Sequence, residues 1–378
     1  MWDIQLFKLN YDQKEVDAVS RVVSGGWLTM GERINDFEVG FANFLGKDVF
    51  CSAVSNGTAA LHLALLALDI GKDHEVIIPA LTFVADANVV YSVGAKPILA
   101  DCKSADDWNV SLESIKKVVT KKTKAIIVVH YAGYPCSDIK EISDFCNDNG
   151  IRLIEDVAHA PGAKIHGKSC GTFGDIGCFS FFSNKNLSIG EGGMLSTLDK
   201  DLDTRLRFLR SHGMTSLTLD RHKGRSITYD ISEPGLNYRM DEMRAALGMV
   251  QLKKLSDGNA KRKIFTNRYR ENFSNTSIKM PFITQPKSSE SVYHILPILL
   301  PYNTQRIDII EFLKEKRIQS SIHYPPFWDF KAYSGDFNSS DTPFVKEIAE
   351  YQLTLPLYPT MTIDDVDKVS SEIIKAIK

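Results

Sequence analysis

The sequence predicts an α/β protein with a mainly parallel sheet and a smaller α+β domain at its C-terminal end. Short apolar segments typical of buried strands occur at 50–54, 75–79, 96–100, 125–129 and 152–154, and amphipathic helical segments alternate with them. Such alternation indicates a parallel sheet covered by helices on both faces. The pattern changes near residue 261. We therefore expect a large domain at 1–255 and a small domain at 256–378.

Composition argues for a small-molecule partner. The chain has 378 residues and a net charge of -2, which gives no electrostatic reason to bind nucleic acid or an anionic membrane. Its six cysteines form no Cys-x-x-Cys pair, so neither a metal site nor a disulfide framework is expected. The N-terminus lacks a signal-peptide pattern, and no apolar run approaches the length of a membrane span. We expect a cytoplasmic protein.

Two helices are predicted before the first strand. Residues 11–24 carry Val16, Val19, Val22 and Val23 at helical spacing and end at two glycines. A loop at 27–31 leads to a second helix with an aromatic face formed by Phe37, Phe41 and Phe44. Trp27 and Met30 in the loop could bind a ligand, although large apolar residues between helices more often belong to the core.

The turn after the first strand is a candidate anion site. Ser55-Asn56-Gly57-Thr58 precedes a helix predicted at 59–68. Free backbone N–H groups and the helix dipole favour a phosphate at such a position, but an ordinary N-cap would look the same. Phe83 follows the strand at 75–79 and precedes a helix that runs through residue 90. It should lie at the sheet edge where open α/β sheets bind ligands.

Asp156 lies just beyond the strand at 152–154, at the same edge of the sheet. A carboxylate there could take part in catalysis, cap a helix or balance a lysine. His159 follows three residues later. Alone, it would more often be a hydrogen-bonded packing residue than a catalytic one.

Residues 179–193 contain a single lysine, Lys185, in a distinctive setting. An apolar strand at 179–182 ends in small polar residues around Lys185, and Gly190-Glu191-Gly192-Gly193 closes the segment with a turn that permits unusual backbone angles. Burial disfavours an ammonium ion, so the pKa of Lys185 should be lowered, as a Schiff-base lysine requires. On spacing alone, an ordinary loop lysine after a core strand remains the alternative.

The rest of the chain is predicted as a turn at 194–197, a charged helix at 200–210, and a long polar stretch at 212–230 that suggests a functional or interface loop. A helix should run from 241 to 255. The small domain would then contain a helix at 261–273, a strand at 292–299, and helices at 306–316 and 363–377.

Taken together, these segments resemble the DegT/DnrJ/EryC1/StrS family of fold-type I pyridoxal-phosphate (PLP) enzymes, the nucleotide-sugar aminotransferases. The resemblance covers almost the whole chain and implies a mainly parallel seven-stranded sheet in the large domain. The matching phrases, in order, are Trp27-Leu28-Thr29-Met30-Gly31, Gly57-Thr58, Thr82-Phe83-Val84-Ala85, Glu155-Asp156, Ala158-His159-Ala160, Ser183-x-Lys185, Gly190-Glu191-Gly192-Gly193, Gly235-x-Asn237-x-Arg239 and Leu355-Pro356-Leu357-Tyr358-Pro359.

The resemblance implies roles for these residues. Lys185 would bind the cofactor as a Schiff base and then move a proton, and Asp156 would keep the pyridine nitrogen protonated. Phe83 would stack on the ring, with His159 packed near it. The phosphate would be bound by Gly57, Thr58, Ala59 and Ser183, and by Asn237 of the neighbouring subunit. The substrate contacts implied by analogy are Leu28, Thr29, His212, Arg239, His323 and Tyr324.

The implied reaction transfers an amino group from L-glutamate, which leaves as 2-oxoglutarate, to a keto group of a nucleotide-linked deoxy sugar. C4 is favoured over C3, and the enzyme would be a homodimer with shared active sites that makes an amino sugar for a surface polysaccharide or a glycosylated metabolite. Lys185 favours transamination over sugar 3-dehydration, because the dehydratases of the family have histidine there.

Other functions remain open on the sequence. A PLP lyase or transferase acting on amino acids would share the fold, whereas a non-enzymatic regulator should lack Lys185 or Asp156. A Rossmann dinucleotide binder would need Gly-x-Gly-x-x-Gly after the first strand, and residues 55–58 do not provide it.

Overall fold

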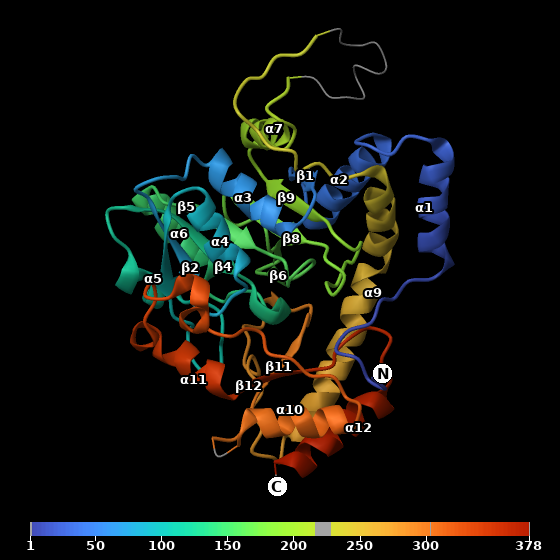
Figure 1. Cartoon of the computed structure of the whole chain (residues 1–378), viewed down its shortest axis with the longest axis vertical. Coiled ribbons are helices and arrows are strands. Elements are labelled where there is room, and N and C mark those ends of the chain that lie inside the picture. Colours follow the sequence, from blue (N-terminus) through green and yellow to red (C-terminus); the bar gives the residue numbers. More distant parts are fainter. Residues whose placement is uncertain (1, 216–227, 303, 378) are drawn as a thin grey trace.

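The computed structural model describes residues 2–215, 228–302 and 304–377 (Figure 1). Within them, the largest sheet has seven strands in the order β1-β9-β8-β5-β4-β2-β3. Strand β9 is antiparallel to both of its neighbours, and the remaining pairs are parallel. The predicted fold class is therefore confirmed. The strands of this sheet are β1 (Phe50–Val54), β2 (Glu75–Pro79), β3 (Lys96–Ala100), β4 (Thr123–Val129), β5 (Arg152–Asp156), β8 (Ile176–Ser180) and β9 (Gly193–Thr197).

Alternate residues of the central strands enter separate cores on the two faces of the sheet. Val76 and Ile78 of β2 pack with helices on one face, whereas Ile77 packs with helices on the other. Because side chains alternate along a strand, a strand that is apolar throughout must be covered on both sides. The helices of this layered part are α3 (Gly57–Ala67), α4 (Ala85–Ser92), α5 (Leu112–Val118), α6 (Ile139–Asn149) and α7 (Lys200–Leu209).

Three helices form a second layer beside β1, β8 and β9: α1 (Gln13–Gly25), α2 (Glu32–Leu45) and α9 (Glu242–Phe273), with α9 in contact with both of the others (Figure 1). Phe41 of α2 packs against Phe179 and Phe181, with ring centroids 4.9 and 5.4 Å away. The buried Glu242 carboxylate accepts the backbone N–H groups of Gly31, Arg33 and Ile34. It thereby caps the first turn of α2.

The C-terminal part packs around the far end of α9 and contains α10 (Arg306–Glu315), α11 (Pro343–Tyr351), α12 (Ile363–Ala376) and the antiparallel pair β11 (Leu296–Leu299) and β12 (Gln352–Leu355). A small sheet joins β6 (Lys164–Ile165), β7 (Lys168–Ser169) and β10 (Ser289–Glu290). Short 3₁₀ turns are η1 (Tyr131–Gly133), η2 (Phe327–Asp329), η3 (Lys331–Tyr333) and η4 (Ser339–Asp341). Among the described helices, none is both long and apolar enough to cross a membrane.

The structure corrects three sequence predictions. The turn expected at 194–197 is strand β9, which is buried because it pairs with both β1 and β8. The helices expected at 241–255 and 261–273 are one helix, α9, in which the apparent break at Asn259 is used for side-chain hydrogen bonds to Asn186 and to the carbonyl oxygen of Pro161. The strand expected at 292–299 is shorter, since Val292 and His294 bond to the turn at 132–133 instead.

The proposed domain boundary, between residues 255 and 256, lies inside α9. This continuous helix therefore belongs to both parts of the chain. We keep the boundary as a proposal about where the sheet-containing part ends.

Candidate active site

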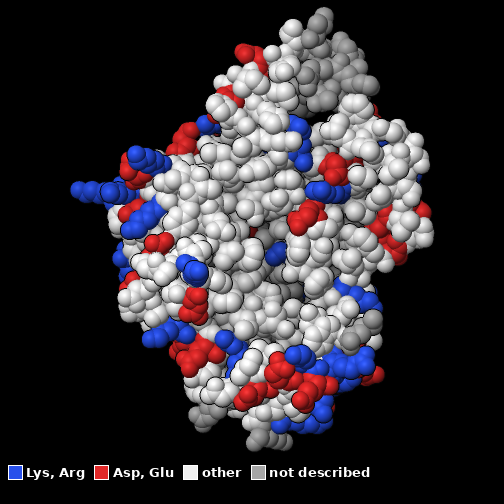
Figure 2. Space-filling view, in the orientation of Figure 1, with Lys and Arg blue, Asp and Glu red and all other residues white. Residues whose placement is uncertain are grey.

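A cavity of about 680 Å³ opens at the carboxyl ends of β4, β5 and β8, the edge predicted from the sequence. Figure 2 shows a hollow near the centre of one face, surrounded mostly by uncharged residues. The charged residues among the cavity lining are Asp156, Lys185 and Glu191. The complete lining is Asn56, Gly57, Thr58, Ala59, Leu61, Thr82, Phe83, Ala85, Val129, Asp156, Ala158, His159, Ser180, Phe182, Asn184, Lys185, Glu191, Tyr238, His323 and Tyr324.

The loop that carries Lys185 is held at several points. The backbone N–H of Lys185 donates to the carbonyl oxygen of Phe182, and Ser188 Oγ donates to the carbonyl oxygen of Ser183. The next residue, Asn186, bonds to Asn259 of α9 and to His294. The lysine is therefore presented by a rigid loop, whereas its own ammonium nitrogen has no hydrogen-bond partner among the described residues.

Burial lowers the pKa of Lys185 to about 8, although the carboxylate of Asp156 acts in the opposite direction. An amine of this pKa is about one quarter neutral at pH 7.5, compared with about one in a thousand for an ordinary lysine. Only the neutral amine is a nucleophile. The site therefore supplies an amine that can react with a carbonyl group near neutral pH.

Asp156 ends β5 inside the cavity and is 7% exposed. Its Oδ1 accepts the N–H of Ala158 at 2.8 Å. Burial raises its pKa, while the Ala158 hydrogen bond and the charge of Lys185 act against this rise. A carboxylate held in this way can accept a strong charge-assisted hydrogen bond from a protonated ring nitrogen.

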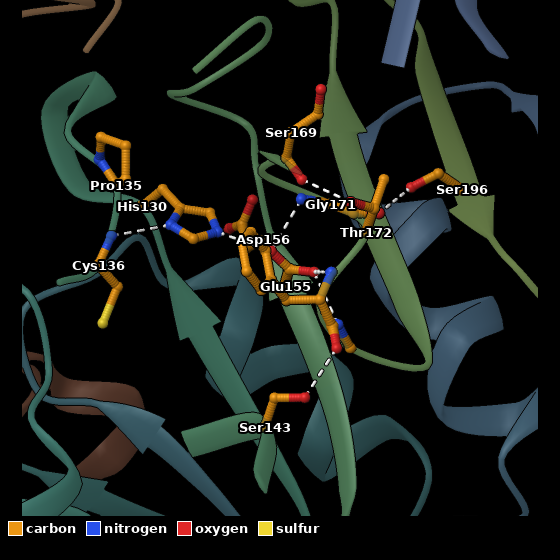
Figure 3. A network of polar contacts seen from close by, with 12 residues as sticks. His130, Pro135, Cys136, Ser143, Glu155, Asp156, Ser169, Gly171, Thr172 and Ser196 are labelled. Carbon is orange, nitrogen blue, oxygen red and sulfur yellow. Dashed lines mark hydrogen bonds and ion pairs between the residues drawn. The ribbon is translucent and has the colours of Figure 1, made fainter. Parts of the chain in front are cut away.

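A buried network fixes the strand end that carries Asp156 (Figure 3). Glu155 accepts the N–H groups of Gly171, Phe173 and Gly174 at 2.6 to 2.9 Å, and its Oε2 lies 2.9 Å from His130 Nε2. His130 Nδ1 accepts the N–H of Cys136, so Nε2 carries the proton that is donated to Glu155. The network ties β5 to the 171–174 turn and to the segment after β4, and this limits the movement of Asp156.

The N-terminus of α3 forms a cradle on another wall. Asn56 caps the helix by accepting the N–H of Ala59 at 2.8 Å, while the N–H groups of Gly57 and Thr58 have no acceptor among the described residues. A Cβ atom at Gly57 would lie 2.8 Å from Cβ of Ser180, so only glycine allows the helix to approach β8 this closely. Free N–H groups at a helix N-terminus bind anions.

Aromatic residues and histidines form the remaining wall. Phe83 is 50% exposed, and its ring centroid lies 5.5 Å from that of Tyr324. His159 and His323 are buried, and burial lowers the pKa of each, to about 4 for His323. Both imidazoles are therefore neutral near pH 7.

The structure brings together nine of the residues predicted from the sequence and leaves six outside this cavity. Those that line it are Gly57, Thr58, Ala59, Phe83, Asp156, His159, Lys185, His323 and Tyr324, and those outside its lining are Leu28, Thr29, Ser183, His212, Asn237 and Arg239. Ser183 Oγ instead donates to the carbonyl oxygen of Gly190. Leu28, Thr29, His212 and Asn237 are exposed.

Sequence reasoning missed several lining residues. Ser180 could have been found because it ends β8 at the same sheet edge as Asp156. Tyr238 lies inside the Gly235-x-Asn237-x-Arg239 motif but had no assigned role. Asp86, buried just below the lining residue Thr82, carries no sequence signal at all.

Replacing Asp86 by asparagine should stabilise the protein, increasingly so as pH rises. Burial and then the nearby Asp156 raise the pKa of Asp86 well above its usual range, and its Oδ1 has no hydrogen-bond partner among the described residues. A carboxyl whose folded pKa is raised loses stability as pH rises from about 4, where the unfolded chain ionises, towards the folded pKa. Urea unfolding at pH 4.5 and 8 should show the gain, with exposed Asp148→Asn as the control. A difference that does not change with pH would contradict this.

Similarity to known proteins agrees with this geometry. The model of the DegT/DnrJ/EryC1/StrS aminotransferase family matches residues 10–374. The chain is 33% identical over 374 residues to the spore coat polysaccharide biosynthesis protein SpsC of Bacillus subtilis, covering 97% of this chain and 95% of that protein. It is also 33% identical over 372 residues to the dTDP-4-dehydro-2,3,6-trideoxy-D-glucose 4-aminotransferase of Saccharopolyspora spinosa, with coverages of 97% and 94%. The PLP-form of Spr1654 from Streptococcus pneumoniae superposes with a TM-score of 0.88 at 27% identity, covering 97% of each chain.

The cavity has groups that fit each functional part of PLP. Lys185 supplies a reactive amine for the aldehyde, Asp156 a buried carboxylate for the ring nitrogen, and the start of α3 free N–H groups for the phosphate. Among the described residues, no cluster of His, Cys, Asp and Glu is arranged to hold a metal ion. The chain belongs to the DegT/DnrJ/EryC1/StrS aminotransferase family and is a PLP-dependent aminotransferase.

Proposed function

We propose that the protein transfers an amino group from L-glutamate to the C4 keto group of a nucleotide-linked deoxy sugar. The observation that carries this proposal is the placement of Lys185, a buried amine with a pKa of about 8, in one cavity with Asp156 and the start of α3. Similarity to a sugar 4-aminotransferase and to a spore coat polysaccharide protein supports the substrate class and a product used in a surface polysaccharide or a glycosylated metabolite.

In the proposed mechanism, Lys185 holds the cofactor and moves the proton. When bound, PLP supplies an electron sink and a covalent carrier for the amino group. The Lys185 amine removes a proton from the donor carbon in one half of the reaction and returns a proton to the sugar carbon in the other. A pKa near 8 suits both directions, because the group must accept and release a proton near neutral pH.

Asp156 and α3 position the cofactor in this proposal. The Asp156 carboxylate keeps the ring nitrogen protonated, and the Glu155 and His130 network keeps the carboxylate in place. The N–H groups of Gly57 and Thr58 would bind the phosphate, together with the Ser180 hydroxyl that closes the same wall. Phe83 would cover the ring from the open side of the cavity.

Both substrates would use the same cavity in turn. Its volume of about 680 Å³ lies within the usual range for small-molecule sites, so a dicarboxylate or a sugar ring can enter, while the nucleotide would extend towards its opening. Storage of the amine between the two halves predicts ping-pong kinetics. We also propose a cytoplasmic location, because all six cysteines are free and buried, as expected for a reducing compartment.

The protein should be a homodimer in which each subunit completes the other's site. Asn237 and His212 are exposed and lie outside the cavity of their own subunit. An antiparallel β-bridge between Ser211 and Asn237 holds the two segments that carry them side by side. The interface loop predicted at 212–230 lies partly outside the described residues. Light scattering with parallel activity assays should show an active dimer, and Asn237→Ala should weaken PLP binding. An active monomer would refute this arrangement.

The direct test of the proposed function is an assay of the purified, PLP-loaded protein with glutamate and a panel of nucleotide-linked 3-keto and 4-keto sugars. Mass spectrometry should detect an aminated product with 4-keto sugars, and initial rates should give parallel double-reciprocal lines. Preference for 3-keto sugars would overturn the C4 assignment. Intersecting lines, or ammonia release without an aminated sugar, would indicate a sequential or lyase reaction.

A further inference from the structure

Two hydrogen bonds fix the proton of His159. The backbone N–H of Ala132 donates to His159 Nδ1 at 3.2 Å, and His159 Nε2 lies 2.9 Å from Tyr324 Oη. A neutral imidazole has one donor and one acceptor nitrogen. Since Nδ1 accepts, Nε2 carries the proton and donates it to Tyr324. Burial, followed by the charge of Lys185, lowers the pKa of His159 well below its usual value, which agrees with a neutral ring.

The backbone that sets this tautomer is itself held in place. Ala132 lies in η1, just after β4, with a positive φ of 56°. Its carbonyl oxygen accepts the N–H of His294, and the adjacent Gly133 carbonyl accepts the N–H of Val292. The N–H of Ala132 therefore points at His159 because both sides of the turn are bonded to another segment.

The hydroxyl of Tyr324 is consequently directed away from His159. Its oxygen accepts from Nε2, so its own proton must be donated elsewhere, and it has no acceptor among the described residues. The Tyr324 carbonyl oxygen accepts from Gln352 Nε2 at 2.8 Å, which fixes the backbone. Tyr324 lines the cavity with Lys185 and Asp156. The free O–H is therefore available to an oxygen atom of a molecule in that cavity.

We propose that Tyr324 donates this hydrogen bond to the carbonyl oxygen of the keto sugar, and that His159 is the positioning residue that aims the hydroxyl. The proposal rests on the function proposed above. The carbonyl carbon must come within proton-transfer reach of Lys185, and its oxygen is only one bond away. The other oxygens of the sugar lie farther from that carbon.

The chemistry gains from such a donor. As the amine nitrogen bonds to the carbonyl carbon, the C=O π bond breaks and its electron pair moves to the oxygen, which then takes up the proton that the nitrogen releases. A hydrogen bond aimed at this oxygen is stronger in the transition state than in the ground state. Burial, followed by the charge of Asp156, raises the pKa of Tyr324 far above its usual value, so the hydroxyl keeps its proton and acts only as a hydrogen-bond donor.

The first experiment replaces Tyr324 by phenylalanine in the PLP-loaded enzyme. Loss of one oxyanion donor should reduce kcat for sugar amination about 100- to 1,000-fold, with KM for the sugar changed less than about threefold. Exchange of the α-hydrogen of glutamate in D₂O needs Lys185 but no carbonyl oxygen, so it should change less than about threefold. Tyr333→Phe is the matched control, because it removes a hydroxyl bonded to Asn88 outside the cavity.

The second experiment tests whether His159 orients the Tyr324 hydroxyl. His159→Gln retains an N–H at the position of Nε2 and should keep most of the sugar amination, whereas His159→Leu should fall as far as Tyr324→Phe. Combining His159→Leu with Tyr324→Phe should cause little further loss. In the cofactor-free protein, ¹⁵N NMR should show the Nε2–H tautomer of His159 at pH 7.

Several outcomes would overturn the inference. They are amination by Tyr324→Phe within threefold of wild type, equal losses in amination and glutamate exchange, an Nδ1–H tautomer of His159, or a His159→Gln variant as slow as His159→Leu. Failure of the proposed function is a separate result: the wild-type enzyme would then aminate no sugar of the panel, while glutamate exchange and the NMR measurement would still report on Lys185 and His159.

Discussion

Replacing Lys185 by alanine is expected to reduce sugar amination by at least about 10⁴-fold, the largest effect of any single substitution in this protein. The variant lacks the amine that we propose holds the cofactor and moves the proton, and a positioned acid–base group alone contributes up to about 10⁴. Initial rates with saturating glutamate and keto sugar measure the loss. Lys140→Ala is the control, since that lysine is exposed and pairs with Asp144.

The same variant should remain folded, which separates loss of chemistry from loss of structure. The pKa of Lys185 is about 8 in the folded protein and about 10.5 in an unfolded chain, so burial of the charged amine destabilises the fold below pH 8. Removing the amine should therefore stabilise the cofactor-free protein at pH 7, and the difference should shrink between pH 8 and 10.5. Urea unfolding at these pH values checks the sign. A Lys185→Ala protein that keeps more than about one tenth of the activity would contradict the role of the lysine.

Replacing Asp156 by asparagine is expected to lower kcat more than about tenfold, a barrier increase above about 1.4 kcal/mol, while some PLP stays bound. An amide accepts a weaker hydrogen bond than a carboxylate and cannot stabilise the positive charge on the ring nitrogen. The site is otherwise preserved, because the Ala158 N–H can still donate to the amide oxygen. Absorbance titration with PLP and steady-state kinetics separate binding from turnover.

The control for Asp156→Asn is Asp148→Asn, which changes an exposed carboxylate on α6. It should leave both PLP binding and kcat unchanged. Near-wild-type turnover by Asp156→Asn would sink the assignment of this residue.

Much of the layered part of the fold could be predicted from sequence because its strands are buried on both faces. Segments such as 76–79 and 125–129 are apolar throughout, and this pattern distinguishes them from half-exposed strands. Strand β9 could not be predicted in this way, because the small residues Gly193 and Ser196 are also typical of a turn. Its strand conformation depends on pairing with β1 and β8 on either side. Helix α9 continues through Gly258 because packing against its neighbours and the bonds of Asn259 override the local helix-breaking signal.

Some residues of the site could likewise be predicted from sequence, and others could not. Asp156 ends a strand, Gly57 begins a helix, and Lys185 lies in the loop that follows β8. Because α/β topology brings such segments to one edge of the sheet, the order of elements placed these residues together. The hydrogen bond between His159 and Tyr324 joins positions 165 residues apart and depends on side-chain orientation, for which sequence has no signal. The same holds for Asp86, whose proximity to Asp156 arises only when α4 packs beneath the sheet edge.

We propose Lys185 as the residue that binds PLP, and borohydride reduction tests this role most directly. The purified protein should be yellow, and sodium borohydride should bleach the colour and fix the cofactor covalently. Tryptic peptide mapping by mass spectrometry should then place the pyridoxyl group on Lys185. Because trypsin does not cleave after a modified lysine, the labelled peptide should run from Ser169 to Lys200. A pyridoxyl group on any other lysine would contradict the account.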